Sequence, residues 1–243
     1  MDFKKTIRYF NGVKDDVMMA GLIAAIALGG IAFIAYNCND MGVVYICVAL
    51  AAIVALGGFI YNDYQKKRLS VTDQDYDSIA RSVLTDLTPR ALSRLGLDIE
   101  EVKEIAPIIF DGYSFEDCTR VKRGLDGIWR SDRYKVVQLF FSLNEVHIYT
   151  YSYSTIMENT SENTDVYFYK DIVSVSTSTE TTTINRYNGQ NNGQNNVGTQ
   201  VQYECFKLTT AGGTSLKVSI RDSANAQRSI NAMRQLLRAK KQM

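Results

Sequence analysis

Basic side chains are concentrated in the segment RVKRGLDGIWRSDRYKVV, residues 120–137 of the 243-residue chain. The segment contains six basic residues, diluted by Asp126 and Asp132: Arg120, Lys122, Arg123, Arg130, Arg133 and Lys135. Arginine and lysine donors suit phosphate oxygens, so the segment is a candidate site for an anion such as a lipid headgroup. The alternative is a solvated loop with no specific ligand.

Other chemistry has little support in the sequence. The chain has one histidine, His147, and four cysteines without a C-x-x-C pair: Cys38, Cys47, Cys118 and Cys205. A structural zinc site needs about four such ligands at close spacing, and no Ser/His/Asp or Cys/His motif frames His147. Acidic and basic residues balance, so composition gives no indication of nucleic acid. We therefore expect no metal, no cofactor, no nucleic-acid partner and no enzymatic activity.

Two uncharged stretches, residues 17–36 and 43–61, are long enough to cross a membrane. They contain twenty and nineteen residues, and at about 1.5 Å per residue each matches the ~30 Å hydrocarbon core. The sequence predicts a transmembrane hairpin over residues 17–61, preceded by a cytoplasmic segment, 1–16. The alternative is a buried helical hairpin of a soluble fold.

Positive charges predict the orientation of this hairpin. Basic residues precede the first span and follow the second, whereas the connecting NCNDMG has none: Lys4, Lys5, Arg8, Lys66, Lys67 and Arg68. Positively charged flanks stay on the cytoplasmic side, so both termini are expected in the cytoplasm, with the chain in the plasma (inner) membrane. These residues are also expected to lie beside membrane lipids.

Small residues recur within both spans, and ALGG occurs at 27–30 and again at 55–58. Folding the hairpin about its loop sets small residues against small residues, which favours close helix packing: Gly21, Gly29, Gly30, Gly57 and Gly58. A gate or substrate pocket is the alternative, although neither span contains an ionisable residue of the kind ion pathways use. An oligomer of hairpins could still form a channel.

Residues 62–105 are predicted to form a helical connector. One helix is expected over 72–87, and the next ends at Gly96, a residue suited to a helix stop. A short helix follows Asp98. Its three glutamates against one lysine oppose binding to DNA phosphates, so a packed adaptor is the favoured interpretation over helix-turn-helix.

A change to two-residue periodicity predicts a cytoplasmic β domain over residues 106–243. Strands are expected at 134–143, 146–155, 166–169, 172–187, 201–210 and 214–220, with a polar loop at 157–164 and a turn containing two NGQN repeats at 188–195. A final helix from Asp222 or Ser223 has an apolar stripe of Ala226, Ile230, Met233 and Leu237. Antiparallel strands closed by such a helix predict a small barrel or sandwich.

The stretch VYFYKDIVSV, residues 166–175, is predicted to change strands at Lys170-Asp171. Ile172 is then expected in the core, with Val173 and Val175 on the opposite side of the new strand. The step YKDI-V-V, together with the terminal IRDSANAQRSINAMRQLL, resembles the bacterial pleckstrin-homology-like (PH-like) domains over roughly residues 106–241. Members of that group often have an N-terminal transmembrane hairpin.

The resemblance implies a function in binding. In PH domains that bind phosphoinositides, basic residues in and after the first strand-to-strand loop hold phosphates, which makes candidates of Lys122, Arg123, Arg130, Arg133 and Lys135. Trp129 is expected to cap the core, or alternatively to insert at the membrane interface. We expect a non-enzymatic membrane protein whose PH-like domain binds a protein, another copy of itself or anionic lipid. The alternative is a subunit of an oligomeric channel or transport assembly.

Overall fold

The computed structural model describes residues 2–12, 16–38, 41–102, 105–185, 198–221 and 223–241. The chain forms two compact units, one of residues 7–72 and one of residues 1–6 with 73–243. A short first helix, α1 (Phe3–Asn11), contains the boundary between them.

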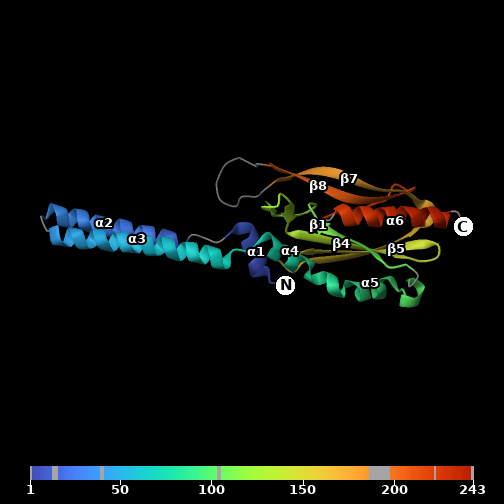
Figure 1. The fold of residues 1–243 in the computed structure, drawn as a ribbon, viewed down its shortest axis with the longest axis horizontal. Coiled ribbons are helices and arrows are strands. Elements are labelled where there is room, and N and C mark those ends of the chain that lie inside the picture. The colour runs from blue at the N-terminus through green and yellow to red at the C-terminus, as the bar shows by residue number, and fades with distance from the viewer. Residues whose placement is uncertain are drawn as a thin grey trace. The chain divides into compact units, whose positions relative to one another are not determined.

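The first unit is a pair of antiparallel helices, α2 (Asp16–Asn37) and α3 (Met41–Leu69), which pack along each other (Figure 1). The contact side is made of small and medium side chains at spacings of three and four residues: Gly21, Ala25, Leu28, Ala32 and Ala35 from α2, and Val44, Cys47, Ala51, Val54 and Gly58 from α3. Large apolar side chains point outward, with Phe33 67% exposed and Ile53 65% exposed. Both helices are long and apolar enough to cross a membrane, as predicted.

The second unit is built mainly from antiparallel strands. A four-stranded sheet has the order β1 (Ile108–Tyr113), β4 (Arg133–Phe141), β5 (Glu145–Ser154), β6 (Thr160–Phe168). A three-stranded sheet has the order β7 (Ile172–Asn185), β8 (Gly198–Thr210), β9 (Ser215–Ser219). A short ribbon pairs β2 (Val121–Arg123) with β3 (Trp129–Ser131). Among the described strands the ladders do not join into a closed barrel.

The main core lies between the two larger sheets and the C-terminal helix α6 (Ser223–Lys241). Phe110 of β1 stacks on Phe206 of β8 with ring centroids 4.1 Å apart, which joins the sheets. The predicted apolar stripe of α6 is confirmed, because Ala226, Ile230, Met233 and Leu237 are all buried in this core. Figure 1 shows α6 lying along the strands.

The predicted connector forms a further layer on the outer face of the four-stranded sheet. Residues 62–69 of the predicted connector continue α3 instead, and the helix expected over 72–87 is interrupted. The layer consists of α4 (Asp73–Arg81), a 3₁₀ turn (Ser82–Asp86), α5 (Leu87–Leu95) and a second 3₁₀ turn (Ile99–Val102). Gln138 of β4 donates from Nε2 to Thr88 Oγ1 at 3.3 Å, and Tyr153 of β5 donates to the Ala80 carbonyl. Gly96 ends α5 in the left-handed conformation at φ 67°, as its position predicted.

Two local predictions are wrong. The polar loop expected at 157–164 ends early, because β6 begins at Thr160, which pairs with Tyr153 near the end of β5. Val175 joins Ile172 in the core, whereas Val173 alone is exposed, at 65%. The reason is a bulge between Ile172 and Ser174, which inserts one extra residue and returns Val175 to the inner face.

The change of strand at Lys170-Asp171 is confirmed as a 3₁₀ turn over Tyr169–Asp171. The NGQN repeats lie outside the described residues.

Candidate functional site

The basic segment folds into the β2–β3 ribbon, in which Lys122 pairs with Arg130 and Arg123 with Trp129. The turn between the strands is held by its own hydrogen bonds. Asp126 Oδ1 accepts from the Ile128 amide at 3.0 Å, and the Gly127 amide donates to the Gly124 carbonyl at 3.1 Å. Gly127 has φ +79°, a conformation that glycine adopts without strain. The turn is therefore a stiff structure.

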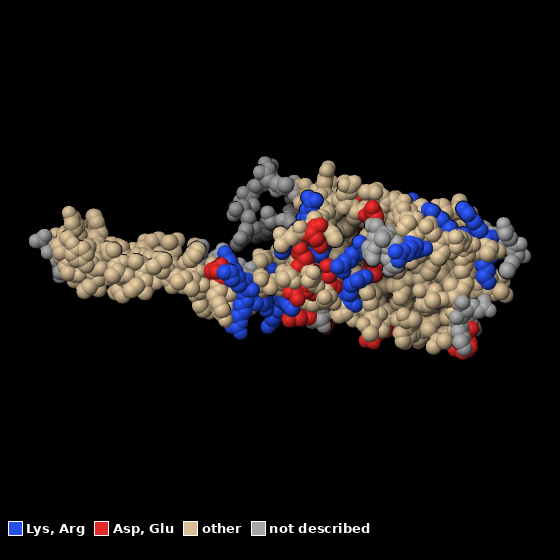
Figure 2. Space-filling model, viewed as in Figure 1, with Lys and Arg blue, Asp and Glu red and all other residues tan. Residues whose placement is uncertain are grey.

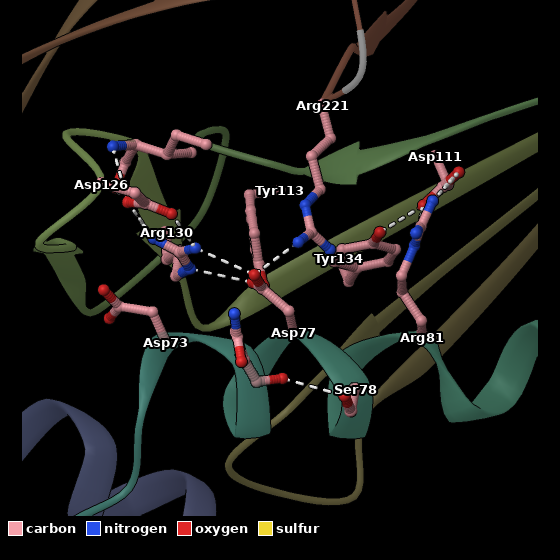
Figure 3. Close-up of polar contacts among 12 residues, drawn as sticks. Asp73, Asp77, Ser78, Arg81, Asp111, Tyr113, Asp126, Arg130, Tyr134 and Arg221 are labelled. Atoms are coloured by element: carbon pink, nitrogen blue, oxygen red, sulfur yellow. Dashed lines mark hydrogen bonds and ion pairs between the residues drawn. The ribbon is translucent and has the colours of Figure 1, made fainter. Parts of the chain in front are cut away.

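Arg130 points from this ribbon into the interior and is only 1% exposed. Its Nε and Nη2 donate to the two carboxylate oxygens of Asp77 on α4, at 2.8 and 2.9 Å (Figure 3). Nη1 and Nη2 donate to Asp126, at 2.9 and 2.6 Å. Two carboxylates thus enclose the guanidinium, so Arg130 is occupied within the fold and does not face a ligand.

Asp77 is the centre of this network and is itself 5% exposed. It also accepts from Arg221 Nη2 at 2.5 Å and from the Tyr113 hydroxyl. Burial, and then the hydrogen bond to Asp77, raise the pKa of Tyr113 well above its usual range. The hydrogen bond from Arg130 lowers the pKa of Asp126 to about 2. Two arginines and two aspartates balance in charge, as buried ions require.

A second polar cluster joins α4 to the sheet one helical turn further on. Arg81 Nε lies 3.1 Å from Asp111 Oδ2, and the Tyr134 hydroxyl donates to the same carboxylate (Figure 3). Burial raises the pKa of Tyr134 above its usual range. Together the two clusters fix α4 to β1, β3 and β4.

The structure does not gather the five predicted phosphate-binding residues into one site. Arg130 is enclosed, and Lys135 Nζ lies 3.4 Å from Glu116 Oε2. Lys122 and Arg133 are half-buried in β2 and β4, and the exposed Arg123 donates from Nε to the Gly127 carbonyl at 3.1 Å. On the face of the second unit visible in Figure 2, basic and acidic side chains are interleaved.

Apolar side chains project at the tip of the ribbon. Leu125 is fully exposed, at 104%, and Ile128 is 41% exposed. Trp129 is half-buried and lines a pocket of about 200 Å³ with Tyr113, Phe115 and Arg221, outside the main core. The Leu125 amide donates to Asp73 Oδ2 at 2.8 Å, which ties the tip to the first residue of α4. Leu125 is the most exposed of the large apolar side chains that the structure describes.

The hairpin glycines occupy two different environments. A Cβ on Gly21 would lie 3.6 Å from the Val54 carbonyl oxygen and 3.8 Å from Gly58 Cα, so these two glycines lie at the helix contact. A Cβ on Gly29, Gly30 or Gly57 would meet nothing within 4 Å. The contact therefore uses Gly21 and Gly58, and leaves the other three on outward surfaces.

The basic residues expected near the membrane surface lie on helices. Lys66, Lys67 and Arg68 form the last turn of α3, where Lys67 pairs with Asp63 at 2.8 Å. Lys4, Lys5 and Arg8 lie on α1. In Figure 2 the surface of the hairpin is free of charge over most of its length, and charges are concentrated near the end of α3.

No group of three or more His, Cys, Asp or Glu side chains that could hold a metal ion is found in the part of the chain that the structure describes. His147 is 8% exposed, and its Nε2 lies 3.2 Å from Glu145 Oε1. The four cysteines are not joined in disulfides.

Sequence reasoning missed Asp77, 53 residues before Arg130 along the chain, and Arg221, 91 residues after it. No local pattern links them. Comparisons with family models, curated proteins and solved structures find no match for this chain.

Proposed function

We propose that this chain is a non-enzymatic integral membrane protein whose hairpin anchors a PH-like binding domain at the cytoplasmic surface. One observation carries the anchoring: the two packed helices expose large apolar side chains on the surface outside their mutual contact, among them Ile23, Phe33, Ile53 and Phe59. Such a surface is unfavourable in water and is satisfied by lipid. A helix satisfies its backbone hydrogen bonds internally, so it is stable in lipid, which offers no hydrogen-bond partner.

The arrangement of the second unit supports the PH-like assignment. Four antiparallel strands form one sheet, three form the other, and a C-terminal helix packs into the core between them. The β2–β3 ribbon is inserted between β1 and β4, in the first strand-to-strand connection of the larger sheet. A closed core with paired buried charges suits a module that binds through its surface.

The anchoring and its orientation are tested by extraction and by thiol labelling. We expect alkaline carbonate to leave the chain in the membrane and detergent to release it. The exposed Cys38, in the predicted external connection, should react with an impermeant maleimide in intact cells. Cys118, in the second unit, should react only after permeabilisation. Release by carbonate would contradict the anchor, and labelling of Cys118 in intact cells would contradict the orientation.

The binding partner is proposed to be a protein, a second copy of the chain or anionic lipid. Interleaved charges and the enclosure of Arg130 argue against one large headgroup pocket. Cross-linking in native membranes followed by mass spectrometry would separate a second copy from another protein. Absence of any cross-linked protein, together with no dependence on anionic lipid, would contradict the proposed binding function.

A channel or transport subunit is the second candidate, and the outward glycines favour it. Gly29, Gly30 and Gly57 leave open space in which a helix of another hairpin could approach closely. Ion flux through the reconstituted chain, abolished by Gly29→Leu with Gly30→Leu but kept in Ala27→Leu, would support it. Flux that is absent from the unaltered chain would exclude it.

A further inference from the structure

The tip of the β2–β3 ribbon, residues 124–129, displays apolar side chains from a rigid support. Leu125 is fully exposed, and Ile128 is 41% exposed. Backbone and carboxylate hydrogen bonds hold the tip: Leu125 N to Asp73 Oδ2 at 2.8 Å, Ile128 N to Asp126 Oδ1 at 3.0 Å, and Gly124 N to the Ile128 carbonyl at 2.9 Å. These hydrogen bonds hold the backbone of the tip with Leu125 outward, and its exposed apolar surface is one that a bound surface would cover.

The charges around the tip favour an anionic surface. Lys122 and Arg123 of β2 lie directly beside the tip. Arg123 donates to the Gly127 carbonyl, and because a carbonyl carries no net charge, this hydrogen bond does not compensate the positive charge of Arg123. The acidic residue of the tip, Asp126, is paired with Arg130 at 2.6 Å. The carboxylate of Asp73 also lies at the tip, where its Oδ2 accepts from the Leu125 amide. The three basic side chains at the tip therefore exceed the two carboxylates by one charge.

The residue that holds this tip follows the anchor closely along the chain. Asp73, which holds the Leu125 amide, begins α4, and only residues 70–72 separate it from Leu69 at the end of α3. Four residue steps of at most about 3.6 Å limit the distance between the Cα atoms of Leu69 and Asp73 to about 14 Å. Lys66, Lys67 and Arg68, in the preceding turn, are of the kind found at a membrane interface.

We propose that residues 124–129 form a docking tip for an anionic bilayer surface. Leu125 and Ile128 enter the boundary between headgroups and acyl chains, and Lys122 and Arg123 lie beside lipid phosphates. This differs from a headgroup pocket, because it needs no convergence of basic residues and Arg130 serves only to support the tip. The inference deepens the proposed function and rests on the hairpin being the membrane anchor.

Trp129 provides the reporter, since it is the chain's single tryptophan and adjoins the tip. The full chain is placed in nanodiscs of phosphatidylcholine, with or without phosphatidylserine, in which some acyl chains are brominated. We expect bromine to quench Trp129 when phosphatidylserine is present, and quenching to weaken in pure phosphatidylcholine and at high salt. Leu125→Ser should shift the docking equilibrium toward the undocked state by about tenfold, because one apolar side chain no longer enters lipid.

A matched control distinguishes docking from general loss of apolar surface. Leu143, in the β4–β5 turn, is 72% exposed but lies outside the proposed contact. Leu143→Ser should leave quenching unchanged. A second reporter combines Trp129→Phe with Leu125→Trp. Bromine should quench this tryptophan more strongly than Trp129, because residue 125 is the position proposed to enter the lipid.

Three results would overturn the docking tip: no quenching in either nanodisc, equal quenching in both, or shielding of Trp129 from iodide without quenching by lipid. The last result would indicate that a protein, such as a second copy, covers the tip. Flotation of the full chain with vesicles of each composition separates this failure from failure of the anchor. A chain that floats with both but shows no quenching keeps the proposed anchor, whereas a chain that does not float loses it.

Discussion

The two units of this protein place large apolar side chains in opposite ways. In the hairpin, small residues such as Gly21 and Ala32 form the contact, and bulky residues such as Phe33 point outward. In the β unit, bulky residues such as Phe110 and Phe206 fill the interior, and the surface is charged. The contrast follows from the solvent, because lipid removes the reason to bury a large apolar side chain and leaves close packing as the main attraction.

Buried polarity shows the same contrast. The described part of α2 and α3 that crosses the predicted bilayer contains no ion pair, whereas the β unit encloses Arg130 between Asp77 and Asp126. Removing one member of a buried pair leaves a charge without compensation. We therefore expect polar substitutions to dominate the stability of the β unit and steric ones to dominate the hairpin.

The largest effect is expected from Asp77→Ala. It would leave Arg130 and Arg221 without their shared carboxylate and should lower the free energy of unfolding by about 3–5 kcal/mol. Denaturant unfolding of the detergent-solubilised chain, followed by Trp129 fluorescence, measures it. Glu116→Ala breaks the exposed pair with Lys135 and should cost no more than about 1 kcal/mol. Equal costs for the two variants would show that the buried network does not hold α4 in place.

A smaller effect is expected from Gly21→Leu in the hairpin. The added side chain meets Val54 and Gly58, and overpacking of this kind costs about 1–3 kcal/mol. We expect the buried Cys47 thiol, 8% exposed at the helix contact, to react faster with maleimide in detergent. Gly57→Leu points into open space and should leave the Cys47 rate unchanged. If both variants accelerate labelling equally, the helix contact differs from the one described.

The bulge in β7 predicts unequal effects from two neighbouring valines. Val175→Ala removes core volume and should cost about 1–2 kcal/mol of unfolding free energy. Val173→Ala changes an exposed side chain and should stay within about 0.5 kcal/mol. The same denaturant unfolding measures both. Small and equal costs would place both valines on the outer side, as strict alternation from Ile172 would, and a larger cost for Val173→Ala would contradict the burial described.

The smallest effect is expected in the pH dependence. The pKa of Asp126 is about 2 in the fold, against 3.8 for an unperturbed aspartate. A lowered pKa means that its contribution to stability is complete above about 3.8 and is lost as the pH falls toward about 2. Asp126→Asn should therefore flatten the fall in unfolding free energy over that interval. Asp165→Asn, on the exposed strand β6, serves as the control, and identical slopes in the two variants would contradict the Arg130 pairing.

Local patterns predicted much of the architecture. The absence of charge over 17–36 and 43–61 indicated two spanning helices, and the spacing of Ala226, Ile230, Met233 and Leu237 indicated the core face of the last helix. These features depend on residues within a few turns of one another, where periodicity and composition act directly. The start of β6 at Thr160 escaped prediction, because pairing with Tyr153 outweighs the polar composition of that stretch.

The candidate site was predicted less completely than the fold. The sequence located the basic segment and the unusual Trp129, but it did not distinguish Arg130, which is enclosed, from Arg123, which is exposed. Both are arginines of one short ribbon. Their roles diverge because Asp77, 53 residues earlier, comes to lie beside only one of them.

The sequence alone determined where apolar surface is continuous, where it alternates and where basic charge gathers, because those properties are carried by neighbouring residues. The tertiary structure decided which glycines meet, which valine enters the core and which basic side chains are enclosed. Those outcomes depend on a bulge, on helix contacts and on ion pairs between distant segments, and such pairings have no signature in the spacing of residues along the chain. The exposed Leu125 gained its significance in the same way, through the hydrogen bond from its amide to Asp73, a residue 52 positions earlier in the chain.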